Sequence, residues 1–355
     1  MYVSSRSPLT DYRGRILQGL IRACIFSIAV VTLTDLSAAR DAGIRSEIIR
    51  IDSPIPGLKL ALHHEFSTTR PALRRSRNIV LFAEGSAVPT SGNAGFKIDG
   101  SSWMDNLADN GFDVWSLDYL GYGESSRYPD TDTGIPPGRA SDCASQLEWA
   151  ARFILKKQRA ERLSVIGDSF GSLVAGIYAT RAPQLLDKLV LFAPLTPVPA
   201  PRATTESRPT PKYRFVTADD LWRLYLSWLP EGESAGLDRN FFLGQWGSRY
   251  LSSDPTSRQR TPPSVMVPAG PDLDSLDIDA GRFPYDPRRI KAPTLVIFGE
   301  WDSVATEDGG KRLFALLTGT KHKRRIVIGR GTHILQLEPV RLDLYREVQT
   351  FLKTS

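Results

Sequence analysis

From residue 46 onward, short apolar runs alternate with longer amphipathic runs. Residues 78–83 form a short run that is apolar throughout after Asn78, which is typical of a strand buried on both faces of a parallel sheet. Residues 140–157 show helical periodicity instead. This alternation predicts an α/β fold, a mostly parallel central sheet with helices on both faces. The expected strands are 47–52, 58–66, 78–83, 112–119, 163–167, 188–194, 293–300 and 324–329. The expected core helices are 102–111, 140–157, 171–182 and 341–354.

Residues 197–290 interrupt this rhythm and are rich in Pro, Trp and Tyr. Residues 218–229 and 238–251 carry aromatic side chains at helical spacing, which predicts a helical cap insertion between two halves of a core, 40–196 and 291–355. Two roles stay open for these aromatics: packing within the insertion, and lining an apolar pocket under a lid. The aromatics concerned are Trp222, Tyr225, Trp228, Phe241, Phe242 and Trp246.

The N-terminal stretch, residues 1–39, has the order of a signal peptide: basic residues, an apolar run at 23–33, then small residues ending at Ala39. It is predicted to be a signal peptide or leader; the alternative is an N-terminal helix packed on the domain. The apolar run is too short to span a bilayer comfortably, so no stable membrane span is expected after processing. If this stretch is a signal peptide, we expect the protein to be exported to the periplasm or the medium. If it is not, we expect a cytoplasmic protein.

Composition and charge indicate which ligands and partners to expect. The 355-residue chain is 41% hydrophobic and 24% charged, with a formal net charge of +6. Its basic residues are scattered and accompany no zinc-ligand spacing or RNA-recognition signature, so we expect a small-molecule substrate and no nucleic acid. The two cysteines, Cys24 and Cys143, form no CxxC motif, so no metal site is indicated. The oligomeric state stays open.

The sequence GDSFG, residues 167–171, lies between an expected strand and an expected helix. A sharp strand-to-helix turn would hold Ser169 in a strained conformation and expose its hydroxyl at the carboxyl edge of the sheet. Gly167 and Gly171 would be needed because a Cβ at either position would collide with neighbouring elements. The alternative is a serine that merely caps a helix in an ordinary turn.

A serine nucleophile needs a base, and the base needs an acid that orients it. Only two histidines follow Ser169. His322 lies in a charged stretch typical of the surface, whereas His333 follows the last expected strand, so His333 is the predicted base. Glu300 and Asp302 follow the strand at 293–300, and Asp302 is preferred as the acid because it lies further into the loop.

Together these segments resemble the α/β-hydrolase family, as a serine hydrolase with a lid or cap insertion. The matching segments are 78–92, 113–126, 165–172, 292–304 and 329–338. The resemblance implies an oxyanion hole made by the backbone N–H groups of Phe170 and Ser86. Glu84 stands where many members have histidine, although Gly85 is retained.

The resulting expectation is a carboxylesterase-like enzyme that cleaves an ester, or a related acyl bond, of a small apolar substrate. Ser169 would form the acyl-enzyme with His333 and Asp302, without metal or organic cofactor. One alternative is an aminopeptidase of the proline-iminopeptidase type, with Glu231 and Glu233 or the acidic run 272–279 holding the substrate ammonium. Another is a cofactor-free lyase or haloperoxidase on the same fold.

Overall fold

A computed structural model describes residues 43–69, 78–129, 134–201, 211–234 and 236–354. By its internal contacts the chain divides into two units, residues 1–33 and 34–355, and every described residue belongs to the second. The predicted leader, residues 1–39, therefore lies outside the described residues. In the described part of the chain, no helix has the length and apolarity needed to cross a bilayer.

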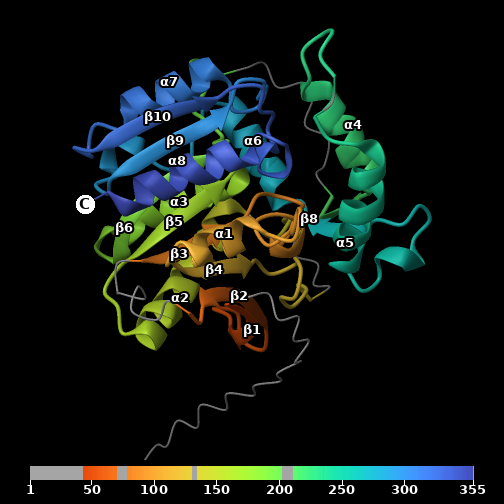
Figure 1. Cartoon of the computed structure of the whole chain (residues 1–355), viewed down its shortest axis with the longest axis horizontal. Coiled ribbons are helices and arrows are strands. Elements are labelled where there is room, and N and C mark those ends of the chain that lie inside the picture. The colour runs from red at the N-terminus through yellow and green to blue at the C-terminus, as the bar shows by residue number, and fades with distance from the viewer. Residues whose placement is uncertain (1–42, 70–77, 130–133, 202–210, 235, 355) are drawn as a thin grey trace, which may run out of the picture. The chain divides into compact units, whose positions relative to one another are not determined.

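The core is an eight-stranded sheet with the order β1-β2-β4-β3-β5-β6-β9-β10 (Figure 1). From β4 to β10 all neighbours are parallel, while β2 is antiparallel to both β1 and β4. The strands are β1 Ile44–Asp52, β2 Lys59–Ser67, β3 Ile79–Ala83, β4 Asp113–Asp118, β5 Leu163–Asp168, β6 Leu186–Phe192, β9 Thr294–Gly299 and β10 Lys323–Ile328.

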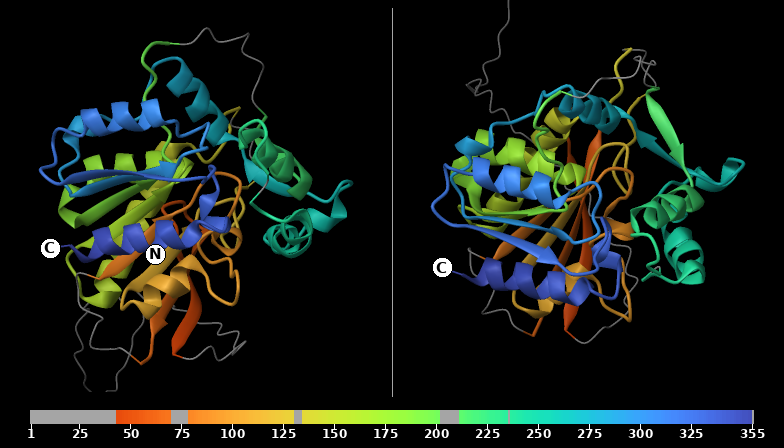
Figure 2. Two further views of the ribbon diagram at one scale, coloured as in Figure 1. Left: turned by 45° about the horizontal axis from the view of Figure 1, so that its top comes forward. Right: turned by 90° about the horizontal axis from the view of Figure 1, so that it is seen from above.

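Helices cover both faces of this sheet, so the predicted α/β class is correct (Figure 2). On one face α1 packs with α8, and the ring of Trp103 stacks on Tyr345 with 5.1 Å between centroids. On the other face α2 packs along α3, while α7 packs against β9 and β10. These helices are α1 Trp103–Asp109, α2 Ala140–Gln158, α3 Phe170–Arg181, α7 Glu307–Leu316 and α8 Arg341–Lys353.

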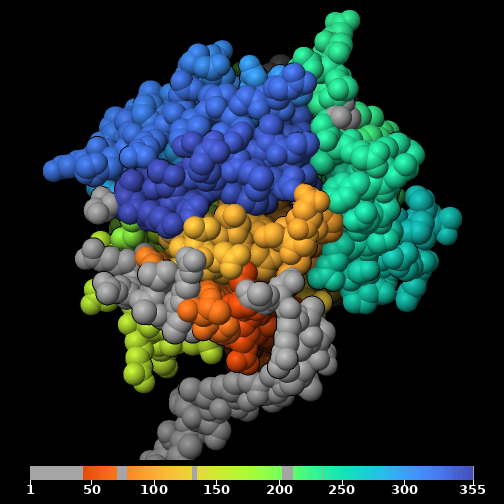
Figure 3. Space-filling model, in the orientation of Figure 1, coloured from red at the N-terminus to blue at the C-terminus, as the bar shows by residue number. Residues whose placement is uncertain are grey.

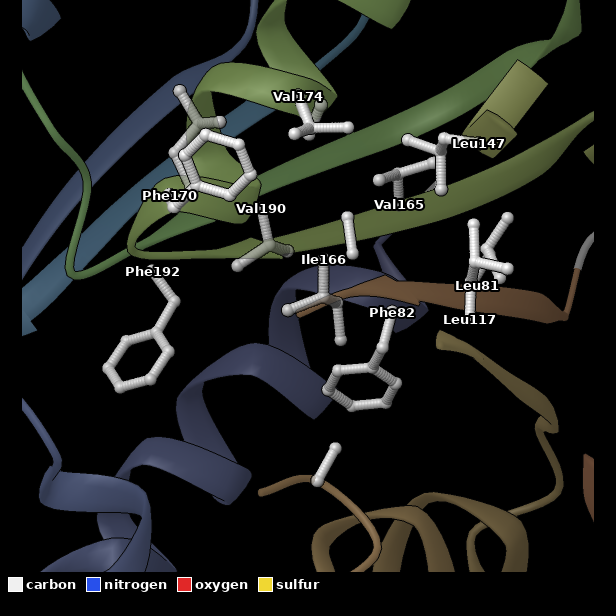
Figure 4. Close-up of a cluster of buried hydrophobic side chains, with 14 of the residues drawn as sticks. Leu81, Phe82, Leu117, Leu147, Val165, Ile166, Phe170, Val174, Val190 and Phe192 are labelled. Atoms are coloured by element: carbon white, nitrogen blue, oxygen red, sulfur yellow. The ribbon is translucent and has the colours of Figure 1, made fainter. Parts of the chain in front are cut away.

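The hydrophobic core lies on both sides of the central strands. Every residue of β3, β5 and β9 is buried, which explains why these segments read as short runs without a polar face. Figure 4 shows Val174 of α3 on one side of the sheet and Phe82 of β3 and Phe192 of β6 on the other. The core thereby holds rigidly the strand ends from which the functional loops emerge.

The insertion, residues 197–290, lies between β6 and β9 in the chain. Two helices fall where the aromatic spacing predicts them, although Phe241–Trp246 winds as a π-helix before α5 begins. The insertion also contains a two-stranded antiparallel sheet, β7 and β8, and a further helix, α6, that the sequence pattern did not predict. Its elements are β7 Tyr213–Val216, α4 Ala218–Trp228, α5 Gly247–Ser252, β8 Val265–Pro268 and α6 Gly270–Asp279.

Part of the insertion packs on the loop that follows β3. The indole N–H of Trp246 donates to the carbonyl of Gly92 at 2.7 Å, and the ring of Phe241 meets Phe96 with 6.0 Å between centroids. Figure 3 shows the insertion, green to teal, directly against the orange segment after β3. The insertion is thus anchored beside the carboxyl ends of the central strands.

Candidate active site

Ser169 occupies the one-residue turn between β5 and α3. Its backbone has φ 52° and ψ −117°, a region that non-glycine residues rarely adopt and that costs on the order of 1–3 kcal/mol. The N–H of Ser169 donates to the carbonyl of Phe192 at the end of β6 at 2.9 Å, which ties the turn to the sheet. The strained turn that the GDSFG sequence predicts is therefore present.

The two flanking glycines allow the close approach of strand and helix that this turn requires. A Cβ on Gly167 would lie 2.5 Å from the carbonyl oxygen of Gly171. A Cβ on Gly171 would lie 1.9 Å from the carbonyl oxygen of Ala83, at the end of β3. Both contacts are with backbone atoms that cannot move aside, so glycine is the residue that fits at both positions.

The hydroxyl of Ser169, the imidazole of His333 and the carboxylate of Asp302 form one hydrogen-bonded chain. His333 Nε2 lies 2.8 Å from Ser169 Oγ, and His333 Nδ1 lies 2.9 Å from Asp302 Oδ2. The three residues come from the ends of β5, β9 and β10, which the parallel sheet brings to one edge. With the proton on Nδ1, Nε2 can accept the serine proton.

Backbone groups orient the Asp302 carboxylate. Its Oδ1 accepts from the N–H groups of Val304 at 2.9 Å and Ala305 at 2.7 Å. Burial disfavours a charged imidazole, but the pKa of His333 is nevertheless raised above 6.5, because the carboxylates of Asp302 and Asp168 favour its protonated form. The two carboxylates therefore favour the imidazolium form of His333.

The alternative base and acid lie elsewhere. Glu300 accepts from the backbone N–H of Arg330 at 2.9 Å and has no bond to His333. His322 is exposed just before β10. Of the residues the sequence left as alternatives, only Asp302 and His333 join Ser169.

The two residues whose backbone N–H groups the family resemblance implies as donors, Ser86 and Phe170, line the same cavity as Ser169. Phe170 is the first residue of α3, where N–H groups have no acceptor within the helix and the helix dipole favours negative charge. Gly85 and Ser86 follow β3, which pairs with β5 up to Gly167. Ser86, Phe170, Ser169 and His333 all line the same cavity. The loop after β3 and the start of α3 therefore both border the cavity beside Ser169.

The cavity beside Ser169 has a volume of about 680 Å³ and is walled by the core loops and the insertion. Three of the aromatics singled out from the sequence, Trp228, Phe242 and Trp246, line it. The ring of Trp228 lies 5.2 Å from that of His333. The other three are absent from the cavity wall and pack instead: Trp222 and Tyr225 against Phe242, and Phe241 against Phe96.

One ion pair also lines the cavity. Arg214 of β7 lies 2.9 Å from Asp272 of α6, so the carboxylate that the acidic run 272–279 brings to the wall is already matched by a cation. Glu231 and Glu233 do not line the cavity, and Glu233 instead pairs with Arg330 at 3.0 Å. None of these carboxylates is thus an unpaired charge beside Ser169.

Sequence reasoning missed three polar residues that line the cavity beside Ser169: Asp168, Asn93 and Gln336. Asp168 is buried directly before Ser169, and its Oδ2 accepts from Asn93 Nδ2 at 2.6 Å. The same Asn93 nitrogen donates to Glu84 Oε2 at 2.6 Å, and Gln336 Nε2 donates to Asn93 Oδ1 at 2.7 Å. Glu84 stood out only by its place before Gly85, and nothing in the local sequence marks Asn93 or Gln336.

Comparisons with known proteins agree with this architecture. A sequence model described as the alpha/beta hydrolase fold matches residues 89–340. Among solved structures, a thioesterase domain from the curacin biosynthetic pathway is similar with a TM-score of 0.56 and 17% identity, covering 87% of this chain and all of that one. A 2-hydroxy-6-oxo-6-phenylhexa-2,4-dienoate hydrolase from Rhodococcus sp. strain RHA1 has a TM-score of 0.56 and 19% identity, with 87% and 100% coverage.

A thermophilic esterase is similar with a TM-score of 0.53 and 19% identity, covering 87% of this chain and 98% of that one. No curated protein matches the sequence significantly. At these identities the solved structures establish the shared fold, while the sequence model covers most of the chain. This chain belongs to the α/β hydrolase fold family.

Proposed function

We propose that the protein is a serine hydrolase that cleaves a carboxylic ester, or a related acyl bond, through an acyl-enzyme on Ser169. The observation that carries the proposal is the hydrogen-bonded chain from Ser169 through His333 to Asp302, beside a cavity of about 680 Å³. A nucleophile, a base and an orienting acid at hydrogen-bond distance are the requirements of acyl transfer.

In the first step His333 Nε2 takes the proton as Ser169 Oγ attacks the carbonyl carbon. Asp302 holds the imidazole by Nδ1 and stabilises the positive charge. The N–H groups of Ser86 and Phe170 receive the oxyanion. His333 then gives its proton to the leaving alcohol, and water repeats the sequence on the acyl-enzyme, which returns free Ser169 and a carboxylic acid.

The walls of the cavity favour an apolar substrate. Trp228, Phe242 and Trp246 bring aromatic surface from the insertion, and Val88 and Leu195 add aliphatic surface from the core. We propose that the insertion acts as the lid that selects the acyl or alcohol part. An aminopeptidase is favoured less, because the Asp272 carboxylate on the cavity wall is paired with Arg214. Asp168, which also lines the cavity, is buried, and one of its oxygens is bound to the Asn93 amide.

The test uses the full-length protein, p-nitrophenyl esters of graded acyl length and aminoacyl anilides. The matched variants are Ser169→Ala and, as a control, Ser145→Ala, an exposed serine on α2. We expect ester turnover that Ser169→Ala abolishes and Ser145→Ala retains. Turnover of anilides alone would replace the proposal with an aminopeptidase. Failure of both substrate classes in a folded protein would favour a lyase, a haloperoxidase or a binding protein.

A further inference from the structure

Asn93 connects two loops that the sheet itself no longer connects. The ladder between β3 and β5 ends at the pair Ala83 and Gly167. There β3 ends, while β5 continues only to Asp168, which pairs with Phe192 of β6. Immediately beyond this last pair, the two N–H groups of the Asn93 side chain reach Glu84 Oε2 and Asp168 Oδ2, each at 2.6 Å. One amide nitrogen thus connects two segments of the site. They are the loop after β3 that carries Ser86, called here the oxyanion loop, and the turn at Ser169, called here the nucleophile turn.

The same amide also reaches the histidine loop. Asn93 Oδ1 accepts from Gln336, three residues after His333, at 2.7 Å. The other carboxyl oxygen of Glu84, Oε1, accepts from the hydroxyl of Ser116 at 2.7 Å. Ser116 Oγ in turn lies 2.8 Å from Thr90 Oγ1. The oxyanion loop, the nucleophile turn and the histidine loop therefore meet at one side-chain amide.

The two carboxyl groups of this arrangement lie in a negative environment. Among the described residues, neither Glu84 nor Asp168 forms an ion pair with lysine or arginine, and Asp168 Oδ1 has no hydrogen-bond partner. The titratable groups that face the two carboxyls are Asp118 with its partner His63, Tyr119, Asp302 and His333. The positive charge of His333, when present, faces Asp168 and not Glu84.

We propose that Glu84, Asn93 and Asp168 form a clamp that sets the spacing of the oxyanion hole, and that Glu84 is its neutral, protonated member. The proposal rests on the proposed function, because the oxyanion hole is assigned there. Glu84 lies two residues before the Ser86 N–H, and Asp168 two residues before the Phe170 N–H. A fixed distance between the two carboxyls consequently fixes the distance between the two donors. All three are positioning residues, since they act through the backbone.

The hydroxyl groups of Ser116 and Thr90 can reorient to accommodate a proton on Glu84. A protonated Oε1 can donate to Ser116 Oγ, which then donates to Thr90 Oγ1 in place of accepting from it. Burial raises the pKa of Glu84 to about 8, and that of Asp168 to about 6. At neutral pH the clamp then carries one negative charge, on Asp168. Above pH 8 a second buried charge would repel the first and separate the two loops.

Kinetics on a p-nitrophenyl ester test the clamp in the full-length protein. Glu84→Ala is expected to lower kcat by about 10- to 100-fold with a small change in KM, because misplaced donors affect the transition state more than substrate binding. Glu84→Gln, a neutral isostere, is expected to recover most of that loss. We also expect the kcat/KM of the wild type to fall above pH 8, and Glu84→Gln to lack this fall.

Glu65→Gln is the matched control. Glu65 is a second buried acid whose pKa burial raises to about 8, but it lies on β2 beside Asp105 of α1, away from the three loops. This variant should keep the wild-type alkaline fall. The clamp is overturned if Glu84→Gln is as defective as Glu84→Ala below pH 7, or if it keeps the wild-type alkaline fall.

Infrared spectroscopy tests the protonation without any turnover, and so separates this inference from the proposed function. In the Ser169→Ala protein at pH 7, adding Glu84→Gln should remove intensity from the carbonyl band of protonated carboxyl groups. An unchanged band would show that Glu84 is ionised and would overturn the neutral member of the clamp. Absence of ester turnover in the wild type, with the band change present, would instead count against the proposed function alone.

Discussion

At the scale of single residues, the orientation of Asp302 is decided by backbone groups. Its Oδ1 accepts from two consecutive loop N–H groups, while both of its oxygens lie within 3.0 Å of His333 Nδ1. The carboxylate can therefore hold the imidazole in one tautomer, the one that leaves Nε2 facing Ser169. The side-chain charge and the local loop geometry act together on this one ring.

Asp302→Asn should separate the role of the charge from that of the shape. The amide can hold the imidazole in the wrong tautomer and cannot stabilise its positive charge, so kcat should fall by on the order of 10⁴-fold. Glu300→Gln is the control, because Glu300 contacts the N–H of Arg330 and not His333. Equal losses in the two variants, measured on the same ester, would contradict the assignment of Asp302.

The pH dependence of kcat/KM should report the environment of His333. Because its pKa is raised above 6.5, and only the neutral imidazole can act as base, the acid limb should have its midpoint above pH 6.5. Asp168→Asn removes one of the carboxylates that favour the charged ring, so the midpoint should move to lower pH. A midpoint that stays in place or rises in this variant would exclude an influence of Asp168 on His333.

At the scale of elements, the decisive contact is the crossing of α3 over the end of β3. Helix α3 is almost wholly buried and begins directly at the nucleophile turn, so it cannot shift outward without disturbing Ser169. Gly171 makes the crossing possible because its Cα faces the carbonyl oxygens of Ala83 and Glu84. The geometry of the candidate site thus depends on a helix–strand contact as much as on the side chains of Ser169, His333 and Asp302.

Gly171→Ala should damage both stability and activity. Its Cβ would lie 1.9 Å from a backbone oxygen, so strand and helix must separate, at a cost of about 1–3 kcal/mol or more in the free energy of unfolding. Gly244→Ala is the control, because a Cβ at that position has no neighbour within 4 Å. Denaturant unfolding and ester turnover of both variants would check this; a stable, active Gly171→Ala protein would refute the crowding argument.

At the scale of the whole molecule, buried acids link the stability of the fold to pH. Glu84 keeps its proton in the folded state up to a pKa of about 8, against an ordinary value of 4.5 when unfolded. Between these values the unfolded state binds fewer protons than the folded state, so the stability contributed at low pH is progressively lost as pH rises.

Glu84→Gln should therefore weaken the decline of stability with pH. Relative to this variant, the wild type is expected to lose up to about 1.4 kcal/mol of unfolding free energy per pH unit between 4.5 and about 8. Urea unfolding at several pH values measures the two slopes. The decline that remains in the variant should include the contribution of Asp168, whose pKa is raised in the same sense. Parallel slopes in the two proteins would contradict a raised pKa for Glu84.

The sequence by itself determined the layered α/β core, and it predicted Ser169, His333 and Asp302, which the structure joins by hydrogen bonds. Continuous apolar strands, amphipathic helices and a glycine-flanked serine are local patterns, and parallel strands bring the loops at their carboxyl ends to one edge. The paired strands β7 and β8 escaped prediction because each is only four residues long and its partner lies far along the chain.

Only the tertiary structure decided which aromatics of the insertion line the cavity, since Trp222 and Trp228 share one helix but face different neighbours. It likewise decided that one asparagine joins Glu84 to Asp168. Neither arrangement has a local signal, because each depends on side chains that lie far apart in the sequence and meet only after the sheet and the insertion have packed.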